Sequence, residues 1–348
     1  MIDAEPSDTE ASPTTGSGRR GGRSPALQAA VFAVLAGAVA LVISGLVPGS
    51  GQRLRHAAVG WIVVEVILEL IACIAYAALF RGVFGGRGRE LGYIRSAQIA
   101  IGELGAFVVV PTGAGGPALR IWALLRSGMP FRTQMVRSVV HAAIFNLPYL
   151  LAALLLGTSV ALGVGPGHAP IAVALAPLGV VLVTVLIAAA AALFARRLGG
   201  QPEGRWARVG RDVIEAIPDG VRELPARLRQ PSLLLAATAY WAGDCGVLAV
   251  AFHAAHDSAP IGVVVLAYML GQLGNALPLP GGVGGVEPIM LGVLTASGVG
   301  LGLGAAAIIL YRFVSLGIQA VAGAIAVVTL TASLPRAPRD AKARSATR

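Results

Sequence analysis

Seven ionisable side chains lie within stretches of sequence that are otherwise almost entirely apolar. They are Glu65, Glu69, Glu103, Arg120, Asp244, Glu287 and Arg312. The planar guanidinium group of arginine binds phosphate and carboxylate oxygens through a fork of N–H donors. Arg120 and Arg312 are therefore candidate ligands for an anionic group. The carboxylates can bind an ammonium group, relay protons or pair with these arginines.

The stretch 277–287, with the sequence LPLPGGVGGVE, cannot form a continuous helix. Pro278 and Pro280 lack backbone N–H donors and restrict the residues before them. The glycines that follow allow sharp turns and close backbone approach. Helical periodicity resumes at Glu287, so we predict a break in the helix that extends to this residue, where the next helical segment begins. Free N–H groups at such a helix start are expected to attract anions.

A second copy of this pattern lies earlier in the chain. Residues 102–116 and 271–285 are identical at seven of fifteen positions, and Ser127-Gly128-Met129 echoes Ser297-Gly298-Val299 after a one-residue insertion. Upstream, Trp61 precedes Glu65 in one copy and Trp241 precedes Asp244 in the other. We interpret these matches as an internal duplication. The alternative is convergent Gly/Pro composition at two unrelated breaks.

Composition places the chain among integral membrane proteins. Of its 348 residues, 56% are hydrophobic and 13% are charged, and the mean hydropathy is +0.77. The net charge of +10 does not indicate nucleic-acid binding, because the basic residues lie mainly beside apolar segments, where they set orientation and meet anionic lipid headgroups. Soluble catalytic and metal-binding motifs are absent, so we expect no enzyme activity, cofactor or metal. Cys73 and Cys245 are expected to be buried thiols.

The hydropathy pattern predicts eight apolar segments between two polar tails, 1–24 and 334–348. Six are single spans, at 27–46, 57–80, 139–162, 170–195, 231–254 and 303–331. The other two are broken hairpins, at 97–126 and 261–298. Residues 196–230, rich in arginine and with apolar residues at helical spacing, are expected to form a cytoplasmic amphipathic segment on the membrane.

Arginine-rich loops, among them the one with Arg126, Arg132 and Arg137, set the expected orientation. They place both termini in the cytoplasm and give the halves 27–162 and 170–331 opposite topology, with the whole transmembrane domain at 25–333. The predicted fold is an all-α polytopic membrane protein with about six full spans and two broken re-entrant hairpins, arranged as two inverted repeats whose hairpin tips face each other. The preference for arginine over lysine is typical of a GC-rich bacterial gene, so a bacterial inner membrane is expected.

Several of the polar residues also have a structural interpretation. Glu65, Glu69 and Cys73 share one helix face, and the two acids can instead form an ion pair with an arginine that locks the helix. Glu103 corresponds to Gln272 in the second copy, so we expect its charge to be dispensable. His141 is expected to be a packed histidine.

The chain resembles the lysylphosphatidylglycerol synthase transmembrane region, a family of flippase-like integral membrane domains, over about residues 27–331. The resemblance is sharpest at Pro278-x-Pro280-Gly281-Gly282-x-Gly284-x-x-Glu287 with Arg312 in the last span. The first-half motif around Pro111 and Arg120 departs from the family, because Gly116 stands where the family has glutamate and Arg120 is shifted by about one residue.

The resemblance implies a protein that moves or handles membrane lipids. The soluble synthase domain of bifunctional members has no counterpart in this sequence, so aminoacyl transfer is not expected. The leading hypothesis is a lipid translocase. Alternatives are a proton-coupled transporter of a small solute, and a scaffold that recruits a cytoplasmic lipid-modifying enzyme through residues 196–230. The expected substrate-binding residues are Arg120, Arg312, Glu287, Asp244, Gly284, Gly285, Gly115 and Gly116, and the expected polar path comprises Glu65, Glu69, Glu103 and Asn275.

Overall fold

The computed structural model describes residues 50–85, 91–110, 114–164, 205–276 and 279–333, with a few isolated positions between 175 and 182. All regular structure in these residues is helical. The predicted tails, the predicted spans at 27–46 and 170–195 and the start of the 196–230 linker lie outside the described residues. The described part includes the other four predicted spans and both predicted hairpins, apart from residues 111–113 and 277–278.

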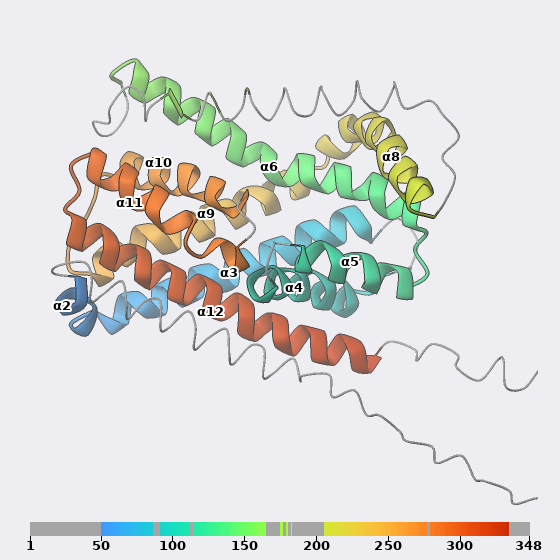
Figure 1. Ribbon diagram of the computed structural model, residues 1–348, viewed down its shortest axis with the longest axis horizontal. Coiled ribbons are helices and arrows are strands. Elements are labelled where there is room, and N and C mark those ends of the chain that lie inside the picture. Colours follow the sequence, from blue (N-terminus) through green and yellow to red (C-terminus); the bar gives the residue numbers. More distant parts are fainter. Residues whose placement is uncertain are drawn as a thin grey trace, which may run out of the picture.

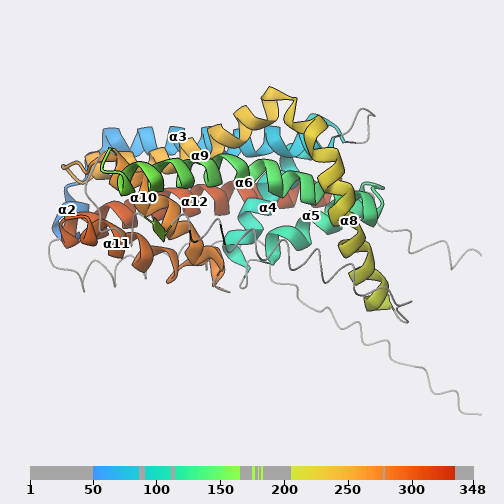
Figure 2. The ribbon, with the colours of Figure 1, turned by 90° about the horizontal axis from the view of Figure 1, so that it is seen from above.

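Four long apolar helices run along the molecule (Figures 1 and 2). They are α3 (Val59–Phe84), α6 (Phe131–Ala161), α9 (Pro231–Ala254) and α12 (Leu301–Ser333). Each is long and apolar enough to cross a bilayer, whose hydrocarbon core requires about 20 helical residues. Proline at the first position of α9 fits a helix start, where its missing N–H costs nothing.

The predicted start of the span at 139–162 is wrong, because α6 begins at Phe131. The sequence suggested a loop because Arg132 and Arg137 precede the apolar run. In the structure both arginines belong to the helix and find partners on neighbouring helices: Arg132 pairs with Asp219, and Arg137 donates to the backbone oxygen of Phe84. The helix therefore extends beyond its apolar part.

Both predicted breaks are present. In the first hairpin, α4 (Tyr93–Val109) and α5 (Gly115–Arg126) flank the break. In the second, α10 (Ile261–Gly271) continues into the short 3₁₀ turns η1 (Gln272–Ala276) and η2 (Pro280–Gly282), and α11 (Val286–Ala296) follows. Three glycines of the second break have positive φ, which glycine adopts without steric cost. They are Gly281 (55°), Gly282 (68°) and Gly284 (86°).

The two hairpins end in the same way. Gly128 after α5 and Gly298 after α11 both have φ of 88°. The next residues, Met129 and Val299, donate their N–H groups back to the oxygens of Leu124 and Leu294. This is the Schellman arrangement that commonly terminates helices. The echo between 127–129 and 297–299 in the sequence thus corresponds to two equivalent helix ends.

The hairpins lie toward opposite ends of the bundle (Figure 1), and the second break lies against the end of α4. A Cβ atom built on Gly281 would lie 3.6 Å from the Cα atom of Val108, near the end of α4. Val108, Leu316 and Ala320 form a small buried apolar cluster there, with Val283 packed against it. The second break is therefore held between the first hairpin and α12.

Glycine contacts bring the central helices unusually close. A Cβ atom on Gly105 of α4 would lie 2.6 Å from the Cα atom of Gly323 on α12. On α9, a Cβ atom at Gly243 would lie 3.2 Å from the Cβ atom of Ala72 on α3. Small residues at helix crossings allow this approach in membrane proteins. The core is thus built around α3, α9 and α12.

Different segments cover the two opposite ends of the helix bundle. At one end, Arg53 of α2 (Ser50–Arg55) donates to the oxygen of Ala255 and pairs with Asp257 at 3.6 Å. At the other end, α8 (Arg205–Leu228) crosses the bundle beside the start of α6 (Figure 2). The helix α8 accounts for most of the predicted amphipathic linker.

Candidate functional site

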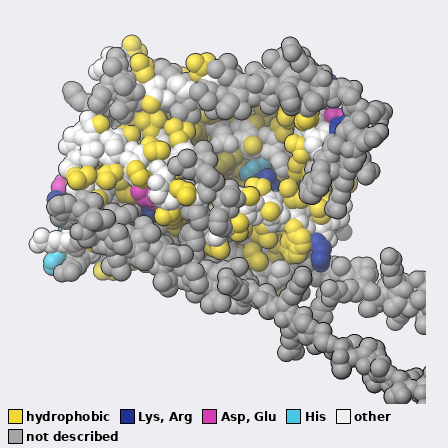
Figure 3. Space-filling view, in the orientation of Figure 1, with side chains coloured by type: hydrophobic (Ala, Val, Ile, Leu, Met, Phe, Trp, Pro, Cys, Tyr) yellow, Lys and Arg dark blue, Asp and Glu magenta, His cyan; other side chains and the backbone are white. Residues whose placement is uncertain are grey.

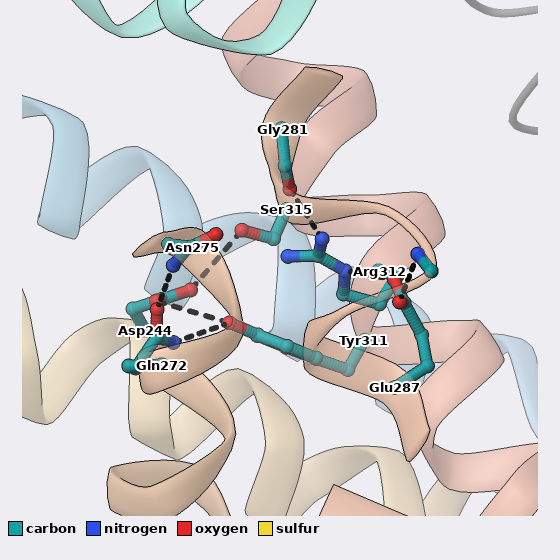
Figure 4. Close-up of polar contacts among 9 residues, drawn as sticks. Asp244, Gln272, Asn275, Gly281, Glu287, Tyr311, Arg312 and Ser315 are labelled. Atoms are coloured by element: carbon teal, nitrogen blue, oxygen red, sulfur yellow. Dashed lines mark hydrogen bonds and ion pairs between the residues drawn. The ribbon is translucent and has the colours of Figure 1, made fainter. Parts of the chain in front are cut away.

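Asp244 lies in the middle of α9, is 5% exposed, and accepts hydrogen bonds from three hydroxyl groups. The hydroxyl groups of Tyr268 and Tyr311 donate to Oδ2 at 2.6 and 3.1 Å, and Ser315 Oγ donates to Oδ1 at 3.1 Å. Figure 4 shows Tyr311 and Ser315 reaching Asp244 from α12. Burying a carboxylate is costly without such donors. The local structure therefore solvates this acid with hydroxyl groups.

The hydrogen bonds continue from Ser315 toward α3. Gln319 Nε2, one turn further along α12, donates to Ser315 Oγ at 3.4 Å and to Glu69 Oε1 at 2.9 Å. The Glu69 Oε2 atom and both carboxylate oxygens of Glu65 are buried and have no hydrogen-bond partner in the described part of the chain. The interpretation of Glu65 and Glu69 as an ion pair with an arginine is thus not realised among the described residues.

The chain also extends from Asp244 toward the second break. Gln272 Nε2 donates to Tyr311 Oη at 3.3 Å, and Asn275 Nδ2 donates to Gln272 Oε1 at 2.6 Å. The result is a buried chain of polar side chains that joins α3, α9, α10, α12 and the first residues of the break. We call it the Asp244 network: Glu69, Asp244, Tyr268, Gln272, Asn275, Tyr311, Ser315 and Gln319.

Arg312 holds the second break in place. Its Nε donates to Glu287 Oε1 at 2.7 Å, and its NH2 group donates to the oxygen of Gly281. The other carboxylate oxygen of Glu287 accepts the N–H of Gly284 at 2.7 Å. The side chains of Arg312 and Glu287 are only 10% and 14% exposed. We call these four residues the Arg312 cluster; it lies beside the Asp244 network on α12 (Figure 4).

The prediction of free N–H groups at the second helix start is wrong for Gly284 and Gly285. The Gly284 N–H is bound by Glu287, and the Gly285 N–H donates to the oxygen of Gly282 at 3.0 Å. The physical reason is the tight turn, which brings acceptors from its own residues within reach. An anion can accept the Gly284 N–H only after the Glu287 carboxylate is displaced from it.

Arg120 in the first hairpin is also paired. Its NH1 group donates to Glu103 Oε1 at 2.7 Å, and the two side chains are 14% and 8% exposed. This buried pair argues against the expectation that the charge of Glu103 is dispensable. The Arg120 Nε and Glu103 Oε2 atoms remain without a hydrogen-bond partner among the described residues.

Gly115 and Gly116 allow α5 to pack closely against α4. A Cβ atom on Gly116 would lie 2.8 Å from the backbone oxygen of Glu103. Glycine at the start of α5 therefore lets it approach α4 closely enough for Arg120 to reach Glu103. The two glycines are buried, which places them between the arms and not on an open surface.

His141 of α6 packs among aromatic rings. Its ring stacks on Phe145 at a centroid distance of 5.9 Å and meets Tyr76 edge-on at 5.5 Å. The guanidinium of Arg120 lies 5.7 Å from the Phe84 ring centroid, and the same ring contacts His141. Figure 3 shows the molecular face hollowed near its middle, with histidine and basic side-chain atoms at the bottom of the hollow.

Sequence analysis included Asn275 in the expected polar path but missed the hydroxyl groups of the Asp244 network and the amides of Gln272 and Gln319. Tyr311, Ser315 and Gln319 are spaced four residues apart on α12 and face the same side. A stripe of polar residues along one face of an otherwise apolar helix is a sequence signal that could have predicted a buried hydrogen-bond network. Tyr268 and Gln272 on the entering arm of the second hairpin show the same spacing.

The arrangement favours binding and exchange of charged or hydrogen-bonding groups. Two arginines have carboxylate partners that an anionic ligand can replace, and a chain of hydroxyl, amide and carboxylate groups can exchange protons or solvate a polar group. Within the described ranges, no three His, Cys, Asp or Glu side chains gather as metal ligands would.

These features define a multi-pass helical membrane protein with buried charged residues both inside its long helices and beside its second helix break. The chain belongs to the family described as the lysylphosphatidylglycerol synthase TM region, whose model matches residues 26–323. A comparison with curated proteins finds no match.

Proposed function

We propose that the protein is a lipid translocase that moves a lipid with an anionic or zwitterionic headgroup across the bacterial inner membrane. The observation that carries the proposal is the Arg312 cluster, in which a buried arginine holds a broken helix next to the Asp244 network. Non-helical backbone at membrane depth is tolerated where it is buried in protein or lines a polar cavity. A polar headgroup needs such a region to pass through hydrocarbon.

The proposed architecture is a pair of inverted repeats with re-entrant hairpins. Three observations support it: the hairpins lie toward opposite ends of the bundle (Figure 1), they have equivalent glycine-capped ends, and the second break contacts the end of α4 in the first hairpin. Inverted repeats with broken helices at the midplane are a common design for alternating access. In this orientation the end that carries α8 faces the cytoplasm, as do both termini.

The headgroup would exchange places with the glutamates. An incoming phosphate offers the same oxygen acceptors as Glu287 or Glu103, so Arg312 and Arg120 can transfer their hydrogen bonds to it. Displacing Glu287 also frees the Gly284 N–H, which then becomes a donor for the same anion. The acyl or polyprenyl chains stay in the lipid. Catalysis and a bound cofactor have no role in this scheme.

A proton-coupled transporter of a small solute is the second candidate. It is favoured by the buried carboxylates of Glu65 and Glu69, which have no arginine partner among the described residues. The scaffold hypothesis, with a cytoplasmic lipid-modifying enzyme recruited through 196–230, has no such specific support. It would require that removal of α8 abolish function while all buried charges stay intact.

The test is lipid translocation in liposomes that contain the purified protein and fluorescent phospholipids or a fluorescent polyprenyl phosphate. A quencher added outside bleaches inner-leaflet probe only as fast as lipids cross. Glu287→Gln and Arg312→Ala remove the two charges of the cluster. Arg53→Ala is the matched control, because Arg53 forms an exposed ion pair at the end of the bundle, 3.6 Å from Asp257.

Fast bleaching by wild type and Arg53→Ala that both cluster variants lose would support the proposal. Bleaching no faster than in protein-free liposomes for every headgroup would overturn it. Uptake of a soluble substrate that depends on a proton gradient would then favour the second candidate.

A further inference from the structure

A small polar cavity lies between α6 and α8, away from the two breaks. Its volume is about 220 Å³, which is room for several water molecules of about 30 Å³ each. It is lined by Arg132, Thr133, Val136, Arg137, Glu223 and Arg227. Three arginine side chains thus line one partly open cavity at the end of the molecule that carries α8.

Two of these guanidinium groups are fixed by the end of α3. Arg137 NH1 donates to the oxygen of Phe84 at 2.6 Å, and Arg227 NH1 donates to the oxygen of Gly82 at 3.2 Å. These carbonyls belong to the last turn of α3, where helix oxygens lack intrahelical partners. Each arginine has five N–H donors, so one bond to α3 leaves donors for another ligand. The cavity is therefore partly pre-organised.

The charge around the cavity favours an anion. Three arginines and one glutamate line it, which gives a net charge of +2 (three minus one). Asp219, outside the lining, pairs with Arg132 at 2.7 Å and with Arg222 at 3.3 Å. Arg132 thus already holds a carboxylate with part of its fork and is itself 58% exposed, which leaves the cavity reachable from solvent.

We propose that this cavity binds the phosphate group of an anionic ligand and thereby joins α8 to α6 and α3. A guanidinium group can donate two parallel hydrogen bonds to two oxygens of one phosphate group. The hydroxyl group of Thr133 adds a further donor. The ligand is either a phosphate-bearing lipid headgroup in the adjacent leaflet or a soluble phosphate ester. The site is separate from the Arg312 cluster and does not depend on lipid translocation.

The contact of α8 with α6 sets the width of the cavity. A Cβ atom on Gly220 of α8 would lie 2.7 Å from the Cβ atom of Val139 and 3.0 Å from the oxygen of Val136. Neither neighbour is the end of a flexible side chain, so Gly220→Ala must push α8 away from α6. This variant widens the cavity while it retains all three arginine side chains of the lining.

The experiment measures the thermal unfolding midpoint of the purified full-length protein in a neutral detergent during ligand titration. Dihexanoyl phosphatidic acid carries the phosphate on a lipid, glycerol 3-phosphate carries it without chains, and dihexanoyl phosphatidylcholine is the zwitterionic comparison. The variants are Arg227→Gln and Arg132→Gln in the cavity, and Arg222→Gln as the matched control. Arg222 is on the same helix, is 80% exposed and does not line the cavity.

We expect saturable stabilisation of wild type and Arg222→Gln, and at least about tenfold weaker binding by Arg227→Gln and Arg132→Gln, because each loses charge-assisted hydrogen bonds. Gly220→Ala should weaken binding, whereas Gly210→Ala, with nothing within 4 Å of its Cβ position, should not. If glycerol 3-phosphate binds as well as phosphatidic acid, the ligand is a soluble phosphate; if only the lipid binds, it is a headgroup.

Two results would overturn the proposal. One is equal phosphate binding by wild type and Arg132→Gln. Among the described residues Arg132 makes no hydrogen bond to α3, so this variant remains informative if Arg227→Gln fails to fold. The other is an equal loss in Arg222→Gln, which would mean that general surface charge attracts the ligand. Loss of lipid translocation by the Glu287→Gln variant, with phosphate binding intact, would separate this site from the proposed function.

Discussion

Alanine at Gly105 tests whether the close crossing of α4 and α12 supports the Asp244 network. A Cβ atom there would lie 2.6 Å from the Cα atom of Gly323 and 2.9 Å from the backbone oxygen of Gln319. Ordinary contacts begin near 3.4 Å, so the helices must separate by about 0.8 Å (3.4 minus 2.6). Both neighbours are backbone atoms, so no side-chain rotation can relieve the contact. The Gln319 amide that bridges Glu69 and Ser315 moves with α12.

Two opposing terms set the expected size of the effect. Overpacking a close contact costs about 1–3 kcal/mol, and replacing glycine by alanine inside a helix contributes about 0.5–1 kcal/mol of stability. We therefore expect Gly105→Ala to lower the free energy of unfolding by about 1–2 kcal/mol. Gly317→Ala on α12 is the matched control, because nothing lies within 4 Å of its Cβ position. It should raise the free energy of unfolding by about 0.5–1 kcal/mol.

The assay is equilibrium unfolding in mixed micelles, followed by helical circular dichroism, with lipid translocation measured on the same preparations. The same chemical change should shift the unfolding midpoint in opposite directions at the two glycines. Translocation should fall only in Gly105→Ala, because only that change displaces Gln319. Equal midpoints for the two variants would refute the reasoning, since they would mean that α4 and α12 do not approach this closely.

Three further predictions concern the site. In a double-mutant cycle of Glu287→Gln and Arg312→Gln, each single change should cost about 3–5 kcal/mol of unfolding free energy, and a cycle that is strictly additive would contradict the buried pair. Asp244→Ala leaves three buried hydroxyl groups without their acceptor and should lower the free energy of unfolding by at least about 1–3 kcal/mol. Asp244→Asn keeps one oxygen acceptor and should lower it less; equal unfolding midpoints for these two variants would contradict this. Gly282→Ala places a Cβ atom against Asn275 at φ of 68° and should cost about 1–3 kcal/mol, with Gly292→Ala, which has open space, as the control in the same unfolding assay.

Local rules predicted the helices and the two breaks. Proline and glycine chemistry identified the break before Glu287, and apolar length identified α3, α9 and α12 to within a few residues. These features depend on neighbouring residues alone. The start of α6 was missed for a related reason, since Arg132 and Arg137 suggest a loop until Asp219 and the end of α3 are in place to accept their hydrogen bonds.

The pairing of the charges could not be predicted in the same way. Glu287 and Arg312 are 25 residues apart, and only the packing of α11 on α12 decides that they meet. The same holds for Asp244, whose three hydroxyl donors come from α10 and α12. The apolar context of each charged residue predicted that it would be buried at a cost in free energy. It could not predict whether a charge would be paired, hydrogen-bonded to hydroxyl groups or, like Glu65, without a partner among the described residues.

The Arg312 cluster also restricts which headgroups can use the proposed path. Removing one partner from a buried ion pair costs about 3–5 kcal/mol, so a neutral headgroup cannot replace Glu287 without leaving Arg312 unpaired. A phosphate that takes over two charge-assisted hydrogen bonds returns about 1.5–3 kcal/mol for each, which is close to the cost of displacing the glutamate. Exchange is then nearly balanced in free energy, and a nearly balanced step lets a ligand both enter and leave. An uncharged diacyl lipid should therefore cross no faster in the presence of the protein than in its absence, and its rapid crossing would mean that the path avoids Arg312.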